Sequence, residues 1–151
     1  MAGDIHVSEA TDADEDLVAA IVHLVSQLSS RPADLTAALT REAITSDATR
    51  VLVARDGDEV VGTLTLAIFA IPSGRRAWIE DVVVDEGARR RGIGELLVRR
   101  AVALATDARV RTVDLTSRAS RAEAHGLYRK VGFEERATNV YRLDVEGNAP
   151  R

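Results

Sequence analysis

The sequence predicts a mixed α/β (α+β) domain, with a central and mostly antiparallel sheet of about six to seven strands that carries about four helices. Three observations predict this class. Apolar residues alternate with period two in the middle of the chain, they recur at spacings of three and four on either side, and strand and helix patterns alternate in the second half. The expected order is β-α-α-β-β-β-α-β-α-β, in a single domain that spans residues 1–151.

The first third of the chain is expected to form one strand and two helices. A short strand is predicted over residues 4–9 and a helix within residues 10–30, where Thr11 and Asp14 have the spacing of a capping box and acidic side chains load the first turn. A second, shorter helix is predicted over residues 33–44, because its apolar residues fall roughly on one side.

The middle of the chain is expected to be a three-stranded meander. Residues 50–71 contain two β-branched, apolar runs joined by a turn at residues 56–58, whose Asp-Gly-Asp sequence tolerates the backbone angles of a hairpin. Another turn at residues 72–74, Pro-Ser-Gly, leads into a third β-rich run over residues 76–85.

Strands and helices are expected to alternate in the second half. The apolar spacing becomes helical from Ile93 onward, a strand is predicted over residues 109–117, and a helix over 120–133 has Gly132 placed to end it in the left-handed conformation. A last strand is predicted over residues 134–145, and a short disordered tail over about residues 146–151.

Composition excludes several classes of function. The net charge of −4 argues against a nucleic-acid partner, and no apolar run approaches the roughly 20 residues of a membrane span. The chain has no cysteine, which excludes a thiol nucleophile and a thiolate metal site, and its three histidines are too scattered to suggest a metal centre. The first residues lack the pattern of a secretory signal, so a cytoplasmic location is expected.

A run of three arginines, Arg89, Arg90 and Arg91, stands directly before the helix expected from residue 93. Cations at a helix N-terminus are disfavoured by roughly 0.3–1 kcal/mol each, so the run suggests that an anion binds there. Gly92 and Gly94 would let main-chain amides converge on a phosphate or pyrophosphate. The residues alone leave this open, because Leu97 stands where a dinucleotide fingerprint has its third glycine.

Two motifs resemble those of the GCN5-related N-acetyltransferase (GNAT) superfamily. The strand that leads into Arg89-x-x-Gly92-x-Gly94 resembles the family's motif A, and residues 124–135, AHGLYRKVGFEE, resemble its second motif. The resemblance covers essentially the whole chain and implies the GNAT fold. It also implies acetyl-coenzyme A, or another short acyl-coenzyme A, as cosubstrate, no metal, and a primary amine of a small molecule or peptide as acceptor.

The resemblance also implies where the cosubstrate would bind. Amides of the glycine loop, with charge from the arginines, would hold the pyrophosphate, and the main chain of the preceding strand would pair with the pantetheine arm. The expected cofactor-binding residues are Val82, Val83, Val84, Arg89, Arg90, Arg91, Gly92, Ile93, Gly94 and Glu95.

Tyr128 would be the general acid that protonates the departing thiolate of coenzyme A, although outside the motif it would read as an ordinary core tyrosine. Glu80 is the expected base, with Asp81 as second choice. Alternation along a strand is expected to place Glu80 on the face shared by Trp78, Val82 and Val84. A solvated carboxylate, or an ion pair to Arg75 or Arg76, is the alternative interpretation of Glu80.

One position departs from the family pattern. Arg121 stands seven residues before Tyr128, where the family often has asparagine, so the family's role for that position does not carry over. Arg121 and Arg118 are expected to contact a phosphate of the cosubstrate or an acidic substrate, or else to be solvated. The expected reaction is direct acetyl transfer to an amine in a ternary complex, without an acyl-enzyme. The alternative is an acyl-coenzyme A-binding regulatory module without catalysis, and exposed sheet edges make a homodimer plausible.

Overall fold

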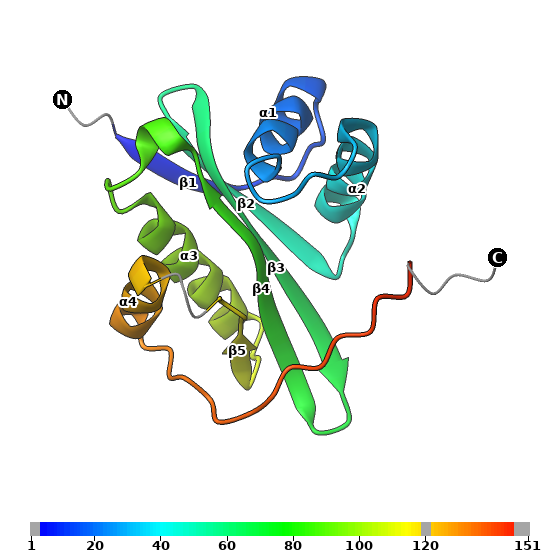
Figure 1. Cartoon of the computed structure of the whole chain (residues 1–151), viewed down its shortest axis with the longest axis vertical. Helices are drawn as coiled ribbons and strands as arrows, with labels where there is room; N and C mark the ends of the chain where they lie inside the picture. The colour runs from blue at the N-terminus through cyan, green and yellow to red at the C-terminus, as the bar shows by residue number, and fades with distance from the viewer. Residues whose placement is uncertain (1–3, 119–121, 147–151) are drawn as a thin grey trace.

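The computed structural model describes residues 4–118 and 122–146 (Figure 1). Its element order follows the predicted one up to the last helix. The elements are β1 (Ile5–Glu9), α1 (Glu15–Val25), α2 (Ala33–Thr45), β2 (Thr49–Asp56), β3 (Glu59–Ile71), β4 (Gly74–Val84), the 3-10 turn η1 (Glu86–Ala88), α3 (Ile93–Asp107), β5 (Thr112–Asp114) and α4 (Ala122–Val131). No helix in the described ranges is both long enough and apolar enough to cross a bilayer.

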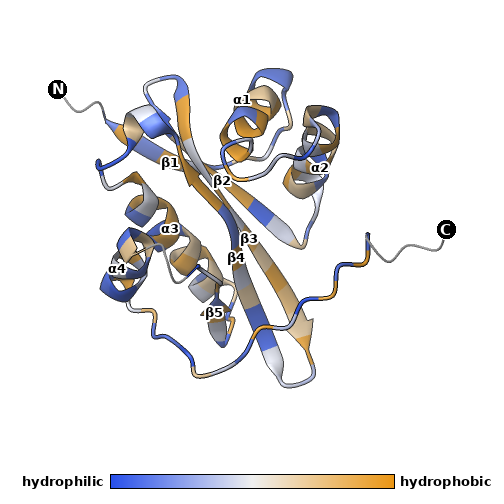
Figure 2. Cartoon of the chain, viewed as in Figure 1, coloured by the Kyte–Doolittle hydropathy of each residue, from blue (hydrophilic) through white to orange (hydrophobic). Residues whose placement is uncertain are grey.

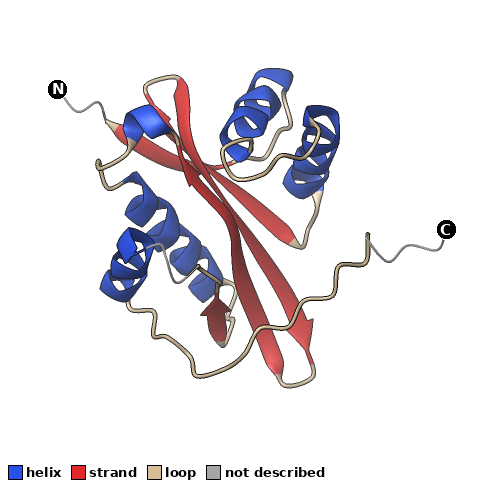
Figure 3. Cartoon of the chain, viewed as in Figure 1, coloured by secondary structure: helices blue, strands red, loops and turns tan. Residues whose placement is uncertain are grey.

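The sheet has five strands in the order β1-β2-β3-β4-β5, not the six to seven expected. The first four strands are antiparallel neighbours, whereas β5 runs parallel to β4. The last strand, predicted over residues 134–145, is not formed. Figures 1 and 3 show that this stretch leaves α4 as an irregular segment and crosses the β3–β4 hairpin, and all of its residues are exposed. The period-two pattern of this stretch is therefore not accompanied by pairing with any of the five described strands.

Helices cover both faces of the sheet. Val51 and Val53 of β2 pack in one cluster with residues of α1 and α2, whereas the alternate residues Leu52 and Ala54 pack with α3. Because neighbouring side chains of a strand point to opposite faces, the two helix pairs lie on opposite sides. Figure 2 shows the apolar residues concentrated on the strands and on the helix surfaces that meet them.

The ends of α1 and α4 show how two sequence signals act in the structure. Asp14, not Thr11, is the N-cap of α1, and its Oδ1 accepts the backbone N–H of Leu17 at 3.0 Å. At the other end of the chain Gly132 follows α4 with φ of 119°, as a residue that ends a helix in the positive-φ region should. The expected tail beyond residue 146 lies outside the described residues.

A β-bulge interrupts β4 in its second half. Glu80 lies opposite Thr65 of β3 and Val83 lies opposite Thr63. Between these two pairs β4 advances by three residues and β3 by only two. Asp81 takes up the extra residue with φ of 50°, a left-handed conformation that aspartate tolerates better than most residues. The alternation of side chains along β4 is therefore reversed beyond this point.

The bulge corrects one expectation about the strand faces. Ile79 before the bulge and Val82 and Val84 after it all pack against the α3 cluster. Glu80 therefore lies on the opposite face from Val82 and Val84, so that of the three residues expected beside it only Trp78 shares its face. The prediction failed because strict period two was assumed across a strand that contains one extra residue.

The core ends before the last third of the chain. Among the described residues after Ala105 none is buried, although several side chains of β5 and α4 are half-buried against the α3 cluster. Apart from Ala10 and Ala88, the buried residues of the two clusters thus lie in β2, β3, β4 and the helices α1, α2 and α3.

Candidate active site

The parallel strands β4 and β5 separate shortly after they meet. Their pairing runs from Arg76 and Thr112 to Trp78 and Asp114, after which β5 ends while β4 continues to Val84. The backbone of residues 79–84 consequently has a neighbour on the β3 side but no β5 residue on the other. A main-chain edge of this kind can pair with an extended ligand as another strand would.

The glycine loop follows the open edge of β4. Gly92 is the N-cap of α3 with φ of 74°, and no side chain caps the helix. Ile93 is 1% exposed and anchors the first turn in the core. The first amides of α3 therefore have no side-chain cap. They lie near the end of the open strand edge, since a Cβ on Gly94 would lie 3.9 Å from Cγ2 of Val84. Uncapped amides at a helix start suit a phosphate group.

The three arginines of the loop have different surroundings. Arg91 donates from Nη1 to Oδ2 of Asp56 at 2.8 Å, so its charge is held by the end of β2. Arg89 and Arg90 are exposed, and Arg90 has φ of 65°. The structure thus separates two exposed arginines from one that is tied to a carboxylate, a difference that the sequence pattern did not indicate.

Glu95 links the loop helix to the helix that carries Tyr128. Its carboxylate accepts hydrogen bonds from Nζ of Lys130 at 2.9 Å and from Nε of Arg99 at 3.1 Å. The hydrogen bond from Lys130, followed by that from Arg99, lowers the pKa of Glu95 below its ordinary value. The first turn of α3 also packs closely against α4, since a Cβ on Gly94 would lie 3.1 Å from Cδ1 of Leu127. The loop and α4 therefore hold each other in position.

Tyr128 lies on the side of α4 that faces β5. Its ring is half-buried against the α3 cluster and meets the edge of Phe133, with 6.0 Å between ring centroids. Together with Trp78 and Val113 it lines a cavity of about 940 Å³ between β4, β5, α4 and the segment after α4. On β4 this cavity is lined by Arg76 and Trp78, which belong to the stretch that pairs with β5. A phenol can act as a proton donor toward a group inside this cavity.

Glu80 lies beside Trp78 on the surface of β4. Its Oε1 accepts a hydrogen bond from Nε1 of Trp78 at 2.7 Å, and its side chain is exposed. Arg75 instead donates to the backbone carbonyl of Ala108, and Asp81 occupies the bulge. Trp78 lines the cavity that Tyr128 also lines, but Glu80 does not. The predicted acid therefore shares a cavity with the residue that donates a hydrogen bond to Glu80, and not with Glu80 itself.

Sequence reasoning missed the other walls of this cavity. The segment after α4 supplies Thr138, Asn139 and Val140, and His125 contributes from α4 while its Nε2 contacts the carbonyl of Arg118 at 2.8 Å. No motif marks residues 138–140, and His125, although it lies within residues 124–135, was not among the expected site residues. Arg121 lies outside the described residues, and within the described ranges no group of three His, Asp or Glu side chains could bind a metal.

Comparison with known proteins identifies the family. The model of the acetyltransferase (GNAT) family matches residues 19–133, most of the chain and both motifs. A probable glucosamine 6-phosphate N-acetyltransferase 2 from Oryza sativa subsp. japonica is 35% identical over 144 aligned residues, which cover 87% of this chain and 82% of the relative.

Solved structures show the same fold. The glucosamine-6-phosphate N-acetyltransferase from Arabidopsis thaliana superposes with a TM-score of 0.77 at 17% identity, covering 93% of this chain and 99% of that one. The aminoglycoside N-acetyltransferase AAC(6')-Iy, solved in complex with coenzyme A, reaches 0.81 at 17% identity, with 95% and 97% covered. The chain therefore belongs to the acetyltransferase (GNAT) family and is an acyl-coenzyme A-dependent N-acyltransferase.

Proposed function

We propose that the chain transfers an acetyl group from acetyl-coenzyme A to a primary amine of a small molecule or a peptide, by direct attack within a ternary complex. One observation carries the proposal. The backbone edge of β4 that β5 leaves open ends beside the uncapped start of α3, where a Cβ on Gly94 would lie 3.9 Å from Cγ2 of Val84 and 3.1 Å from Cδ1 of Leu127, the residue before Tyr128 on α4.

The main chain would bind the cosubstrate. Amides of residues 90–95 would hold the pyrophosphate, with Arg89 and Arg90 adding positive charge, while the edge from Val82 to Val84 would pair with the pantetheine arm. The amides of Val82 and Val83 would polarise the thioester carbonyl. Most of the rate would come from holding the amine against that carbonyl, because positioning alone removes a large part of a bimolecular barrier.

Two side chains would move protons. Tyr128 would protonate the departing thiolate from inside the cavity, and Glu80 would take the proton that the amine loses, with Asp81 as second choice. The hydrogen bond from Trp78 would hold the Glu80 carboxylate in one orientation. Since Glu80 lies outside the cavity lining, a water molecule would carry the proton between the amine and this carboxylate.

The acceptor test begins with amino sugar phosphates, because the rice relative at 35% identity is named for glucosamine 6-phosphate. Other small amines, aminoglycosides and peptide N-termini complete the panel. Release of free thiol from acetyl-coenzyme A reports transfer to any of them. Calorimetry with acetyl-coenzyme A measures binding separately. Tight binding without release of thiol on any acceptor would favour the regulatory module over the enzyme.

The role of Tyr128 has a matched control in the same chain. Tyr128→Phe should lower kcat by about 100-fold or more while leaving the affinity for acetyl-coenzyme A unchanged, since general acids contribute about 10²–10⁴-fold. Tyr141, the other tyrosine, is 89% exposed and Tyr141→Phe should leave kcat unchanged. Equal rates for Tyr128→Phe and the unmodified protein would remove Tyr128 from the mechanism.

A further inference from the structure

Arg91 stands in the glycine loop between two residues whose backbone is left-handed. Arg90 has φ of 65° and Gly92 has φ of 74°, whereas the φ of Arg91 is not positive. Backbone that alternates in this way turns successive N–H groups toward one side of the chain, and the resulting concavity attracts anions. The conformation of the loop is therefore what would receive a diphosphate.

The loop needs contacts that hold this conformation. A non-glycine residue such as Arg90 is disfavoured at positive φ and keeps it only where the surroundings impose it. The two ends of the loop are anchored in the core, since Ala88 is 3% and Ile93 1% exposed. Between these anchors residues 89, 90 and 92 are exposed, and Arg91 is half-buried. Arg91 is therefore the side chain through which the middle of the loop can be held.

Asp56 binds Arg91 from the end of β2. Nη1 of Arg91 donates to Oδ2 of Asp56 at 2.8 Å, and the two side chains are 26% and 30% exposed. Asp56 is itself part of the sheet, where it lies opposite Ile5 of β1 and Glu59 of β3. The carboxylate thus belongs to a fixed element, and the side chain of Arg91 ties the loop to it.

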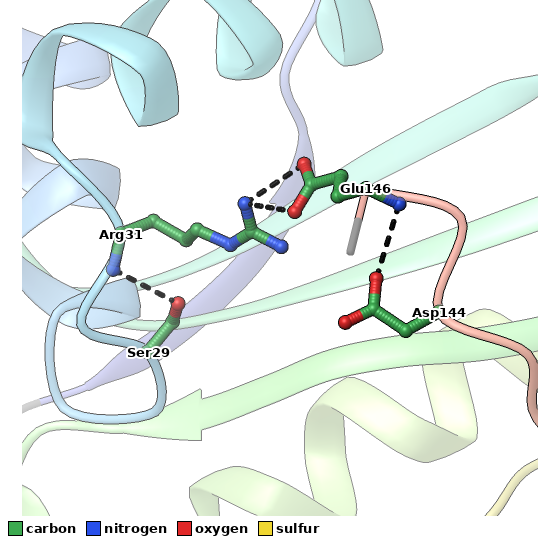
Figure 4. A network of polar contacts seen from close by, with 4 residues as sticks. All are labelled: Ser29, Arg31, Asp144 and Glu146. Carbon is green, nitrogen blue, oxygen red and sulfur yellow. Dashed lines mark hydrogen bonds and ion pairs between the residues drawn. The ribbon is translucent and has the colours of Figure 1, made fainter. Parts of the chain in front are cut away.

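The low exposure of this ion pair distinguishes it from pairs on the open surface. Figure 4 shows one of those, in which Nη1 of Arg31 lies 2.6 Å from Oε2 of Glu146 while the two side chains are 55% and 65% exposed. Exposed pairs are screened by water and salt, and they hold little in place. The pair of Arg91 with Asp56 is screened less, because most of each side chain is covered.

We propose that Arg91 is a positioning residue for the cosubstrate and not one of its ligands. Asp56 holds the guanidinium of Arg91 at the sheet, and this contact keeps the loop amides directed at the diphosphate. Arg89 and Arg90, which are exposed, supply the positive charge that faces it. The inference rests on the proposed function, because it assigns a role within the proposed cosubstrate site.

Neutralising Asp56 separates positioning from direct contact. If Arg91 bound a phosphate itself, Asp56 would compete with that phosphate for the guanidinium, and Asp56→Asn would raise the affinity for acetyl-coenzyme A or leave it unchanged. Removal of a negative charge near a polyanionic ligand acts in the same direction. Positioning predicts the opposite sign, because the loop loses its tie to the sheet and the affinity falls.

Calorimetry with acetyl-coenzyme A measures this affinity. Asp56→Asn and Arg91→Gln should each weaken binding by about five- to tenfold, and the double variant should bind no more weakly than either, because both changes break the same contact. The matched control is Asp58→Asn, which removes the same charge two residues away from an exposed side chain and should leave the affinity unchanged. Circular dichroism checks that each variant is folded.

Kinetics and a conservative variant distinguish positioning from a purely structural role. With an accepted amine, Asp56→Asn should raise the KM for acetyl-coenzyme A by the same factor and leave kcat unchanged, whereas a general loss of structure would lower kcat. Arg91→Lys keeps a donor for Asp56 and should retain most of the affinity. The same lysine combined with Asp56→Asn should not.

The outcomes separate this inference from the proposed function. If the unmodified protein binds no acetyl-coenzyme A, both fail. If it binds but Asp56→Asn leaves the affinity unchanged or raises it, only the role of Arg91 is overturned. Losses that add up in the double variant would overturn it as well, because Arg91 and Asp56 would then act independently.

Discussion

The contribution of α3 to the stability of the domain can be measured by truncating one leucine. Leu97 is 0% exposed and packs in the cluster that joins α3 to the sheet. Packing is tight at this place, since a Cβ on Gly62 of β3 would lie 3.2 Å from Cδ1 of Leu97. Leu→Ala changes at buried sites cost about 2–5 kcal/mol, and the cost rises when the surroundings cannot collapse. We expect Leu97→Ala to lower the free energy of unfolding by about 3–5 kcal/mol.

The neighbouring residue provides the control. Leu96 stands on the same helix but is 43% exposed, so Leu96→Ala makes the same chemical change without opening a cavity. Its cost should stay below about 1 kcal/mol. Urea unfolding followed by circular dichroism measures both, and with a slope of about 1–3 kcal/mol per molar the midpoint of Leu97→Ala should fall by about 1–5 M.

Equal losses in the two variants would refute this reasoning. They would mean that α3 is stabilised by its helix propensity and not by its contact with the sheet. Since domains of this size are stable by only about 5–15 kcal/mol, the expected difference is a large part of the total.

Three further variants test the caps and charges. Asp14→Ala should destabilise the fold by about 1 kcal/mol in urea unfolding, and no loss would exclude Asp14 as the cap of α1. Glu95→Gln should lower the melting temperature at neutral pH. Because folding lowers the pKa of Glu95, its contribution should vanish as pH falls from 4.5, and a pH-independent difference would contradict this. Gly92→Ala should weaken calorimetric binding of acetyl-coenzyme A, since φ of 74° disfavours alanine, and unchanged affinity would argue against the loop.

Much of the fold was predictable because its signals are local. The turn at residues 56–58 and the glycines before α3 specify their backbone by residue type, and the structure has a hairpin and a helix start there. The bulge was not predictable, because nothing in the sequence distinguishes Asp81 from an ordinary strand residue. The extra residue becomes evident only from the pairing of β4 with Thr63 and Thr65 of β3.

The candidate site was predictable only where motifs mark it. The glycine loop and Tyr128 stand in motifs, and the structure packs Gly94 against Leu127 of the helix that carries Tyr128, while the roles of these residues stay predictions. The failed last strand has a different cause. Residues 134–145 do alternate as a strand should, but alternation alone does not decide whether a segment pairs, because strand formation depends on the neighbours that the segment meets.

None of the described residues after Ala105 is buried, and this bears on how the protein unfolds locally. Segments with few buried contacts unfold locally at low free energy while the core stays intact. Amide hydrogens of α4 should therefore exchange with deuterium well before those of β2 and β3. Tyr128 would be carried by the part of the molecule that opens first, and a bound cosubstrate that bridges α3 and α4 would slow that exchange.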